Sequence, residues 1–342
     1  MELIQVGDLH LPDSAGVGCL SKYVEQPEQM VLSELQVVVD YARDQHVKDI
    51  VLAGDLCNNP RMSYEAQLAL DSFLTKNSDR QWHILPGNHD MFGMDYTQGH
   101  SLELLVRLHA QNKSVRFYLE PKTVKIGGVR TRFLPYPSVD FKRNMLNVFH
   151  NEVRGAKNDA GKAFDHEGLS SSKAVALGGH LHTAHRIRNT WFSGTLYQTN
   201  FGERLPKFFH HVEYRSDDDY EVRRIPHDPV YKLYNIVVES RGDLDSIPVG
   251  DRNLVKLVVA DGADIGPSDV ARFPNIVEHR NFKTKQDLAS VLTEDMSHGH
   301  EVAFKVSDFF SAWIESYDVP DPLRAKIKDV RKRILNNVKA TK

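Results

Sequence analysis

The sequence predicts an α/β fold: a two-sheet β-sandwich with flanking helices, then a small α+β cap and a C-terminal helix-loop-helix. Short apolar runs alternate with helical patterns at the start of the chain, and extended segments dominate from residue 115 to residue 225. The chain has 342 residues, more than the ~250 to 300 at which a single core stops growing. Hydrophobic content of 41% and charged content of 26% exclude a disordered or fibrous protein.

Strands and helices alternate at the start of the chain. Apolar runs predict strands at residues 3–6, 50–52 and 82–85. The stretch that opens with Pro27 and the stretch over residues 66–74 both repeat apolar side chains at helical spacing. Each of these two stretches therefore predicts an amphipathic helix.

The middle of the chain consists mostly of expected strands. After a helix near residues 101–111, strands are expected at residues 115–118, 122–126, 129–134, 145–149 and 174–177, with shorter ones up to residue 225. Gly127 and Gly128 separate two of these segments and predict a hairpin turn. The order of elements favours two packed sheets with outer helices.

Changes in pattern divide the chain into three expected parts: residues 1–226, 230–298 and 301–342. Pro226 and Pro229 mark the first boundary. The second part holds strand-like runs at residues 234–238 and 254–259 and a helical stretch near residues 284–292, enough for a small module.

The C-terminal helices carry the side chains that we expect to bind a partner. One face of each helix is apolar, with Phe310, Trp313, Ile314 and Tyr317 on the first and Ile327, Val330 and Ile334 on the second. Residues 323–342 hold eight Lys or Arg and one Asp, so residues 1–322 carry 35 basic against 45 acidic side chains. A helix packed on its own domain gives the same pattern. We favour docking to a partner helix, with the basic face against that partner or DNA phosphate.

Polar side chains follow five of the predicted strands at the point where each strand ends. In chain order the groups are Gly7-Asp8-Leu9-His10, Gly54-Asp55, Gly87-Asn88-His89-Asp90, His150 and Gly179-His180-Leu181-His182. Ligands of α/β sheets bind beyond the carboxyl ends of the strands, so we expect these groups to converge. One such dipeptide is more often a turn, but five in this order are hard to attribute to chance.

The residue types in these groups suit a pair of metal ions. Carboxylate, amide and imidazole ligands favour Mn²⁺, Fe²⁺ or Zn²⁺, and no thiolate cluster competes. Seven ligands exceed what one ion needs, whereas two ions ~3.5 to 4 Å apart could share them. Asp55 is the natural bridge because it stands alone at its strand end. The expected ligands are Asp8, His10, Asp55, Asn88, His150, His180 and His182.

With these motifs, about the first 210 residues resemble the calcineurin-like metallophosphoesterase superfamily. The resemblance implies one metal on Asp8, His10 and His182, a second on Asn88, His150 and His180, and Asp55 as the bridge. It also implies that His89 protonates the leaving oxygen of the scissile phosphate and that Asp90 fixes the ring of His89.

The chain further resembles the SbcD family, the nuclease subunits of the double-strand-break repair complex, of which phages encode counterparts. The residues that carry this likeness are 149–155, 177–182, Ser193-Gly194-Thr195 and Asn200-Phe201-Gly202-Glu203. The likeness implies a DNA nuclease with 3′-to-5′ exonuclease action on duplex ends and endonuclease action on single strands. It implies two Mn²⁺ ions, with Mg²⁺ as the alternative. It also implies a homodimer within a heterotetramer, whose C-terminal helices bind an SbcC-type coiled-coil ATPase in repair and recombination.

Two other hypotheses stay open beside the nuclease. One is a small-molecule or cyclic-nucleotide phosphodiesterase on the same fold, and the other is a non-catalytic scaffold that binds a partner through its helices. Cys19 and Cys57 cannot form a disulfide framework, and no apolar run of membrane-spanning length occurs. We therefore expect a cytoplasmic protein, in the host cytoplasm if a phage encodes it. We interpret Cys57 as a packing residue because the metal pair has no need of a thiol.

Overall fold

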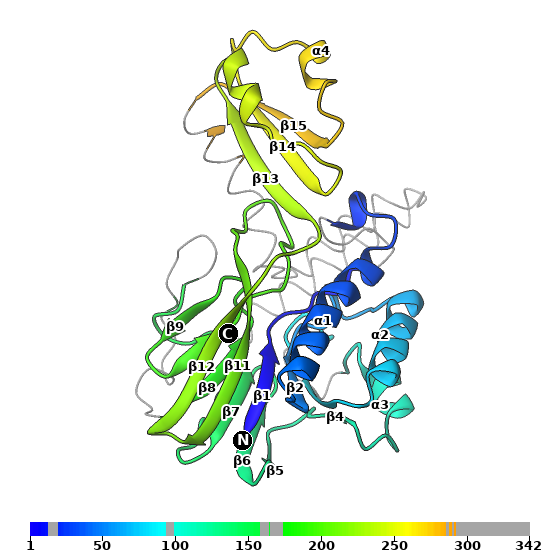
Figure 1. Cartoon of the computed structure of the whole chain (residues 1–342), viewed down its shortest axis with the longest axis vertical. Helices are drawn as coiled ribbons and strands as arrows, with labels where there is room; N and C mark the ends of the chain where they lie inside the picture. The colour runs from blue at the N-terminus through cyan, green and yellow to red at the C-terminus, as the bar shows by residue number, and fades with distance from the viewer. Residues whose placement is uncertain are drawn as a thin grey trace, which may run out of the picture. The chain divides into compact units, whose positions relative to one another are not determined.

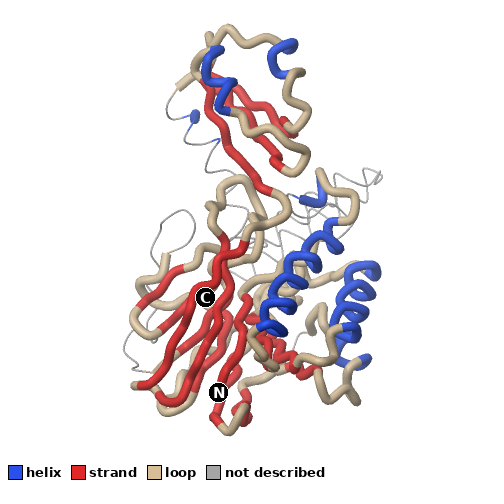
Figure 2. The backbone as a smooth tube through the Cα atoms, viewed as in Figure 1, coloured by secondary structure: helices blue, strands red, loops and turns tan. Residues whose placement is uncertain are grey.

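The computed structural model describes residues 1–12, 20–93, 99–157, 164, 174–284, 287–288 and 291. These residues form two six-stranded sheets, one three-stranded sheet and a few helices (Figures 1 and 2). The expected C-terminal helix-loop-helix and all seven of its proposed partner-binding residues lie outside the described residues. Cys19 lies outside them as well.

The first sheet has the strand order β12-β11-β1-β2-β3-β4. Its strands are β1 (Glu2–Val6), β2 (Asp49–Ala53), β3 (Gln81–Leu85), β4 (Val115–Phe117), β11 (Lys207–Ser216) and β12 (Asp219–His227). β1 to β4 run parallel to one another, and β11 pairs with β1 in antiparallel fashion. The carboxyl ends of β1, β2 and β3 therefore meet at one edge of the sheet.

Three helices cover one face of the first sheet (Figure 1): α1 (Pro27–Asp44), α2 (Tyr64–Lys76) and α3 (Glu103–Leu108). Pro27 occupies the first turn of α1, where its missing N–H costs no helical hydrogen bond. Ser63 caps α2 by accepting a hydrogen bond from the Ala66 N–H at 3.2 Å. Leu35 of α1 and Leu70 of α2 are fully buried against the sheet. Both predicted amphipathic helices are thus present with the expected buried faces.

The second sheet has the order β5-β6-β7-β8-β10-β9. Its strands are β5 (Lys122–Ile126), β6 (Val129–Leu134), β7 (Leu146–His150), β8 (Ala176–Gly179), β9 (His185–Ile187) and β10 (Thr190–Phe192). β6, β7, β8 and β10 are parallel, and β5 joins β6 through the predicted turn at Gly127 and Gly128, both with positive φ. Leu3 and Val51 of the first sheet and Val148 of the second share one buried cluster. The two-sheet sandwich is confirmed.

A small parallel sheet follows the sandwich in the chain. It consists of β13 (Lys232–Val238), β14 (Asn253–Ala260) and β15 (Ile276–Phe282), with a 3₁₀ helix η3 (Arg241–Ser246) and a short helix α4 (Pro267–Val270). The sequence predicted β13 and β14 but not β15, because four of the seven residues of β15 are polar and only Phe282 is buried. The helix expected near residues 284–292 lies partly outside the described residues.

Candidate metal centre

All seven expected ligands lie where the ends of the two large sheets meet. Asp8, Asp55 and Asn88 follow β1, β2 and β3 of the first sheet. His150 is the last residue of β7, and His180 comes directly after β8 in the second sheet. The parallel direction of these strands explains why residues far apart in the chain converge.

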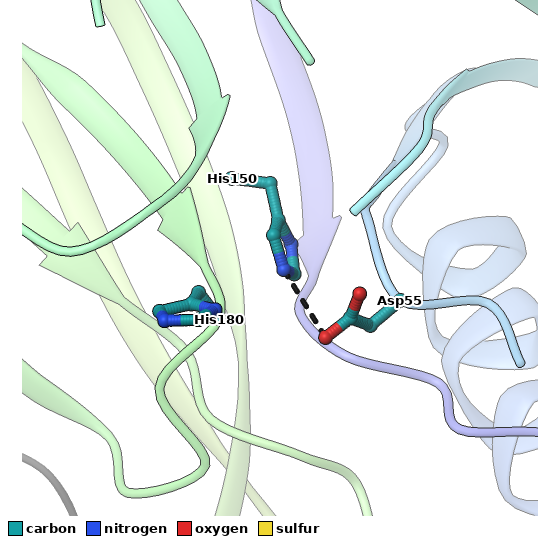
Figure 3. Close-up of side chains that lie close together, drawn as sticks. All are labelled: Asp55, His150 and His180. Atoms are coloured by element: carbon teal, nitrogen blue, oxygen red, sulfur yellow. Dashed lines mark ion pairs between the residues drawn. The ribbon is translucent and has the colours of Figure 1, made fainter. Parts of the chain in front are cut away.

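Asp55, His150 and His180 form one group that could hold a metal ion (Figure 3). The Nε2 atom of His150 is 3.2 Å from Oδ2 of Asp55. Asn88 completes this group, because its Oδ1 atom lies 3.1 Å from His150 Nε2 and 2.9 Å from His180 Nδ1. The donor set is thus one carboxylate, one amide oxygen and two imidazoles.

Asp8, His10 and Asp55 form a second such group, which shares Asp55 with the first. The Nε2 atom of His10 lies 3.8 Å from Asp55 Oδ2 and 3.0 Å from the Nε2 atom of His182. The carboxylate of Asp55 therefore lies between two ligand groups, which is the geometry of a bridging ligand in a two-metal site.

Hydrogen bonds fix which ring nitrogens carry protons in this cluster. The Nδ1 atom of His150 is 2.7 Å from the carbonyl oxygen of Ala53. A carbonyl can only accept, so Nδ1 always carries a proton and Nε2 is the nitrogen left for a metal ion beside Asp55. The Nδ1 atom of His182 lies 2.8 Å from Oε1 of Glu203, which leaves Nε2 as the nitrogen of His182 that can bind a metal ion.

The charge balance at the site fits bound cations. Asp8 is fully buried, and among the described residues its Oδ2 atom has no hydrogen-bond partner. Burial raises the pKa of the Asp8 carboxyl. Burial also opposes ionisation of Asp55, but His150 and then His89 hold the pKa of Asp55 well below its usual range. A fully buried carboxylate oxygen without a proton donor costs free energy that a metal ion would offset.

The protonation of His150 reflects the same crowding of acidic groups. Burial opposes its protonation, but Asp55 and then Asp8 outweigh burial and raise the pKa of His150 to about 9. A proton on the ring stands in for part of the positive charge that metal ions would supply, and it must leave when a metal binds.

The backbone at the site is held in unusual conformations. His10, Asp55 and His180 have φ values of 46°, 47° and 85°, which L-residues rarely adopt. Gly54 and Gly87, each directly before a ligand, are also required because a larger side chain would overlap with a ligand. A Cβ atom on Gly87 would lie 2.1 Å from Asp55 Oδ1, and one on Gly54 would lie 2.1 Å from His150 Nδ1. The Gly-Asp and Gly-Asn motifs therefore reflect close packing of backbone against ligands.

His89 lies beside the ligands, with its ring centroid 5.0 Å from that of His10. Its backbone N–H donates to Asp55 Oδ1 at 2.8 Å, and its Nδ1 atom is 2.8 Å from the carbonyl oxygen of Asn58. The contact that orients the ring is therefore with Asn58, whereas the sequence interpretation gave this task to Asp90. Every residue has a backbone carbonyl, so the pattern of side chains along the sequence could not identify Asn58 as the partner of His89.

Asp90 instead joins two of the ligand loops. Its carboxylate accepts the N–H groups of Gly87 at 2.9 Å, Leu56 at 3.2 Å and Cys57 at 3.1 Å. The Cys57 Sγ atom is also 3.1 Å from Asp90 Oδ1. Burial, followed by the charge of Asp55, raises the pKa of Asp90 to about 6. Cys57 is buried, as a packing residue should be, but it also makes a polar contact with Asp90.

Glu203 is the second residue that sequence reasoning did not place at the site. It belongs to the quoted segment Asn200-Phe201-Gly202-Glu203, and the likeness that this segment carries gave it no chemical role. The structure places it against His182 and, on its other side, against Lys207. A Glu followed by a Lys four residues later was the signal available in the sequence.

The sequence model of one protein family, described as Calcineurin-like phosphoesterase, matches residues 1–265. The chain belongs to this family. Calcineurin-like phosphoesterases hydrolyse phosphoesters with two metal ions, so this phosphoesterase is a metal-dependent hydrolase of phosphoester bonds. A search of curated proteins found no significant match to it. In the part of the phosphoesterase that the structure describes, no helix has both the length and the apolar character needed to cross a membrane.

Proposed function

We propose that this phosphoesterase is a metal-dependent DNA nuclease of the SbcD type, acting with an SbcC-type ATPase in double-strand-break repair and recombination. The observation that carries the proposal is the contact between Glu203 and His182. Glu203 comes from the segment that most distinguishes SbcD-like sequences, and this contact gives the segment a task at the metal centre. The proposed actions are 3′-to-5′ exonuclease on duplex ends and endonuclease on single strands.

The proposed ligands divide between two divalent ions, most simply Mn²⁺, with Mg²⁺ as the alternative. Asp8, His10 and His182 would hold one, Asn88, His150 and His180 the other, and Asp55 both. Bound there, two divalent ions supply polarisation of a phosphoryl group and an activated water. Oxygen and nitrogen ligands of this kind suit Mn²⁺.

His89 is the proposed general acid. Because its Nδ1 atom donates to Asn58, Nε2 is the nitrogen that can give a proton to the leaving oxygen. Its N–H bond to Asp55 keeps the ring beside the ligands. Asp90 supports this arrangement from a distance, because it holds together the loops that carry Asp55 and His89.

The proposed partners rest on apolar side chains that are not among the seven expected ligands. Phe310, Trp313, Ile314, Tyr317, Ile327, Val330 and Ile334 would dock the coiled-coil base of the ATPase. A second copy of the chain would pair through α2 and α3, where Tyr64, Leu68, Leu104 and Leu108 are exposed large apolar side chains. The complex would act in the cytoplasm, of the host if a phage encodes the chain.

The test of the function uses the full chain with linear DNA and Mn²⁺. Wild-type protein should degrade the DNA, and His89→Asn should lose cleavage while keeping two bound metal ions, since Asn can still donate to Asn58 but has no Nε2 atom. His46→Asn, a change at an exposed turn, is the matched control and should cleave normally. Full activity of His89→Asn would overturn the assignment of the acid.

The substrate class is tested in parallel with bis(p-nitrophenyl) phosphate. Rapid turnover of this small ester without any cleavage of DNA would favour the small-molecule or cyclic-nucleotide phosphodiesterase. The partner is tested by a pull-down of a long coiled-coil ATPase with and without residues 301–342. Unchanged capture after the deletion would contradict docking through the C-terminal helices.

A further inference from the structure

The segment of residues 193–203, between β10 and β11, connects a metal ligand to the small sheet. We call it the 193–203 segment. Glu203 at its end is only 4% exposed, and its Oε1 atom lies 2.8 Å from Nδ1 of His182. The Thr199 hydroxyl donates to the same carboxylate oxygen. These contacts inside the protein hold the Oε1 atom of Glu203 beside Nδ1 of His182.

The other oxygen of Glu203 is held by a buried lysine. The ammonium group of Lys207 contacts Oε2 of Glu203, and Lys207 is only 3% exposed. Lys207 also donates to Oγ1 of Thr195 at 2.8 Å. A buried carboxylate with a buried ammonium beside it is stable in the ionised form and has a fixed orientation.

The fixed carboxylate determines how His182 faces the site. By accepting the Nδ1 proton it directs the lone pair of Nε2 toward His10, whose Nε2 atom is 3.0 Å away. Carboxylates that hold metal-binding histidines in this way fix the tautomer and make the ring a stronger ligand. Glu203 therefore acts on the metal centre through His182, without facing it.

The same segment is bound to β13, the first strand of the small sheet. Gln198 is 2% exposed, and its side chain pairs with the backbone of Leu233: Nε2 donates to the Leu233 oxygen at 2.9 Å, and Oε1 accepts the Leu233 N–H at 2.9 Å. The Gln198 amide also donates to the carbonyl oxygen of Glu203 at 2.8 Å. Asn235 of β13 donates to the carbonyl oxygen of Phe201 at 2.8 Å.

We propose that Glu203 is a positioning residue for the metal ligand His182, and that Gln198 couples the placement of β13 to the metal affinity of that ligand. The coupling runs through the three hydrogen bonds of one buried amide, two to Leu233 and one to the backbone of Glu203, and from Glu203 to His182. A displacement of β13 relative to the sandwich then changes how tightly the Asp8, His10 and His182 group holds its ion.

The first experiment measures Mn²⁺ binding to the full chain by calorimetry in the absence of DNA. Glu203→Gln should weaken one of two binding events by ~10- to 100-fold and leave the other unchanged, as loss of an outer-shell partner does elsewhere. His182→Asn serves as the reference that removes the ligand itself and should weaken the same event. Equal Mn²⁺ affinities of Glu203→Gln and wild type would overturn the positioning role.

Because Glu203→Gln leaves the ammonium of Lys207 without its carboxylate, the double variant Glu203→Gln/Lys207→Met is the second arm. It removes both charges, and far-UV circular dichroism checks that it folds. The proposal expects the double variant to bind Mn²⁺ as weakly as the single one. Recovery of wild-type affinity in the double variant would mean that the buried charge caused the loss, and it would overturn the proposal.

The second experiment tests the coupling to β13. Gln198→Leu should weaken the same Mn²⁺ binding event, although among the described residues Gln198 forms side-chain hydrogen bonds to the backbone of Glu203 and Leu233 and to none of the seven ligands. Gln67→Leu in helix α2 is the matched control, since it removes a side-chain bond to the carbonyl oxygen of Met62, which precedes that helix. If Gln198→Leu and Gln67→Leu bind Mn²⁺ equally well, the coupling is absent. Both experiments read metal binding alone, so their outcome does not depend on whether DNA is the substrate.

Discussion

The Nε2 atom of His150, the last residue of β7, lies 3.2 Å from the Oδ2 atom of Asp55, just beyond β2. This contact joins the ends of the two large sheets at one carboxylate. The same carboxylate oxygen also faces His10 at 3.8 Å, so a single side chain serves both ligand groups.

The shared position of Asp55 predicts an all-or-none effect on metal content. Asp55→Asn should reduce bound Mn²⁺ from two ions per chain to less than one, because both groups lose their common carboxylate. Asn88→Ala should leave about one ion, since it affects one group only. Elemental analysis after dialysis gives the stoichiometry, with Asp49→Asn as a carboxylate control away from the site. Two retained ions in Asp55→Asn would rule out the bridging role.

Close packing at Gly87 predicts that even one methyl group damages the site. In Gly87→Ala the new Cβ would meet Asp55 Oδ1 at 2.1 Å and His150 Nε2 at 2.6 Å, so the ligands must move apart. We expect loss of metal and a free energy of unfolding lowered by ~1 to 3 kcal/mol, the usual cost of overpacking. Gly242→Ala, whose Cβ would meet only Ser240 Oγ at 3.9 Å, should change neither property. Urea unfolding and elemental analysis measure the two effects.

Metal binding should stabilise the folded chain. The unfolded chain has no assembled ligand groups, so Mn²⁺ at 100 times its dissociation constant adds about 2.7 kcal/mol to the free energy of unfolding. Thermal unfolding in Mn²⁺ and in EDTA measures the difference. Asp55→Asn should lose most of it. Identical melting temperatures of the wild type under the two conditions would contradict a preformed metal site.

His210 predicts acid sensitivity of the fold away from the metal centre. Burial, and then the charge of Arg224, lowers the pKa of His210 to about 3, while its Nδ1 atom is 2.8 Å from Gln5 Oε1. Between the ordinary pKa of ~6.5 and the lowered value the unfolded chain binds a proton that the folded chain does not. The stabilising contribution of the neutral ring is therefore complete above that range and is lost as the pH falls.

The measurement is the free energy of unfolding at several pH values from 7 to 4. His210→Asn, which can still donate to Gln5, should show a shallower fall with decreasing pH than wild type, by up to ~1.4 kcal/mol per pH unit. The difference in slope separates the titration from any constant loss of packing. Parallel curves for the two proteins would show that His210 does not titrate in this way.

The sequence by itself determined the ligand types and the strand ends that carry them. Apolar strands followed by Gly-Asp, Gly-Asn and Gly-His groups predicted the sandwich and the convergence of seven side chains, because parallel strands end at a common edge. The strand β15 was not predicted, because its sequence shows neither a long apolar run nor a clear alternation of apolar and polar residues.

Only the tertiary structure decided which groups orient the ligands. His10 and His182 are 172 positions apart, and their contact depends on how the two sheets pack. The partners of His150 and His89 are the backbone carbonyls of Ala53 and Asn58, and every residue has a carbonyl, so no side-chain pattern reveals them. Spacing along a chain constrains strands and helices, whereas the orientation of a buried ring depends on atoms that packing brings to it from elsewhere.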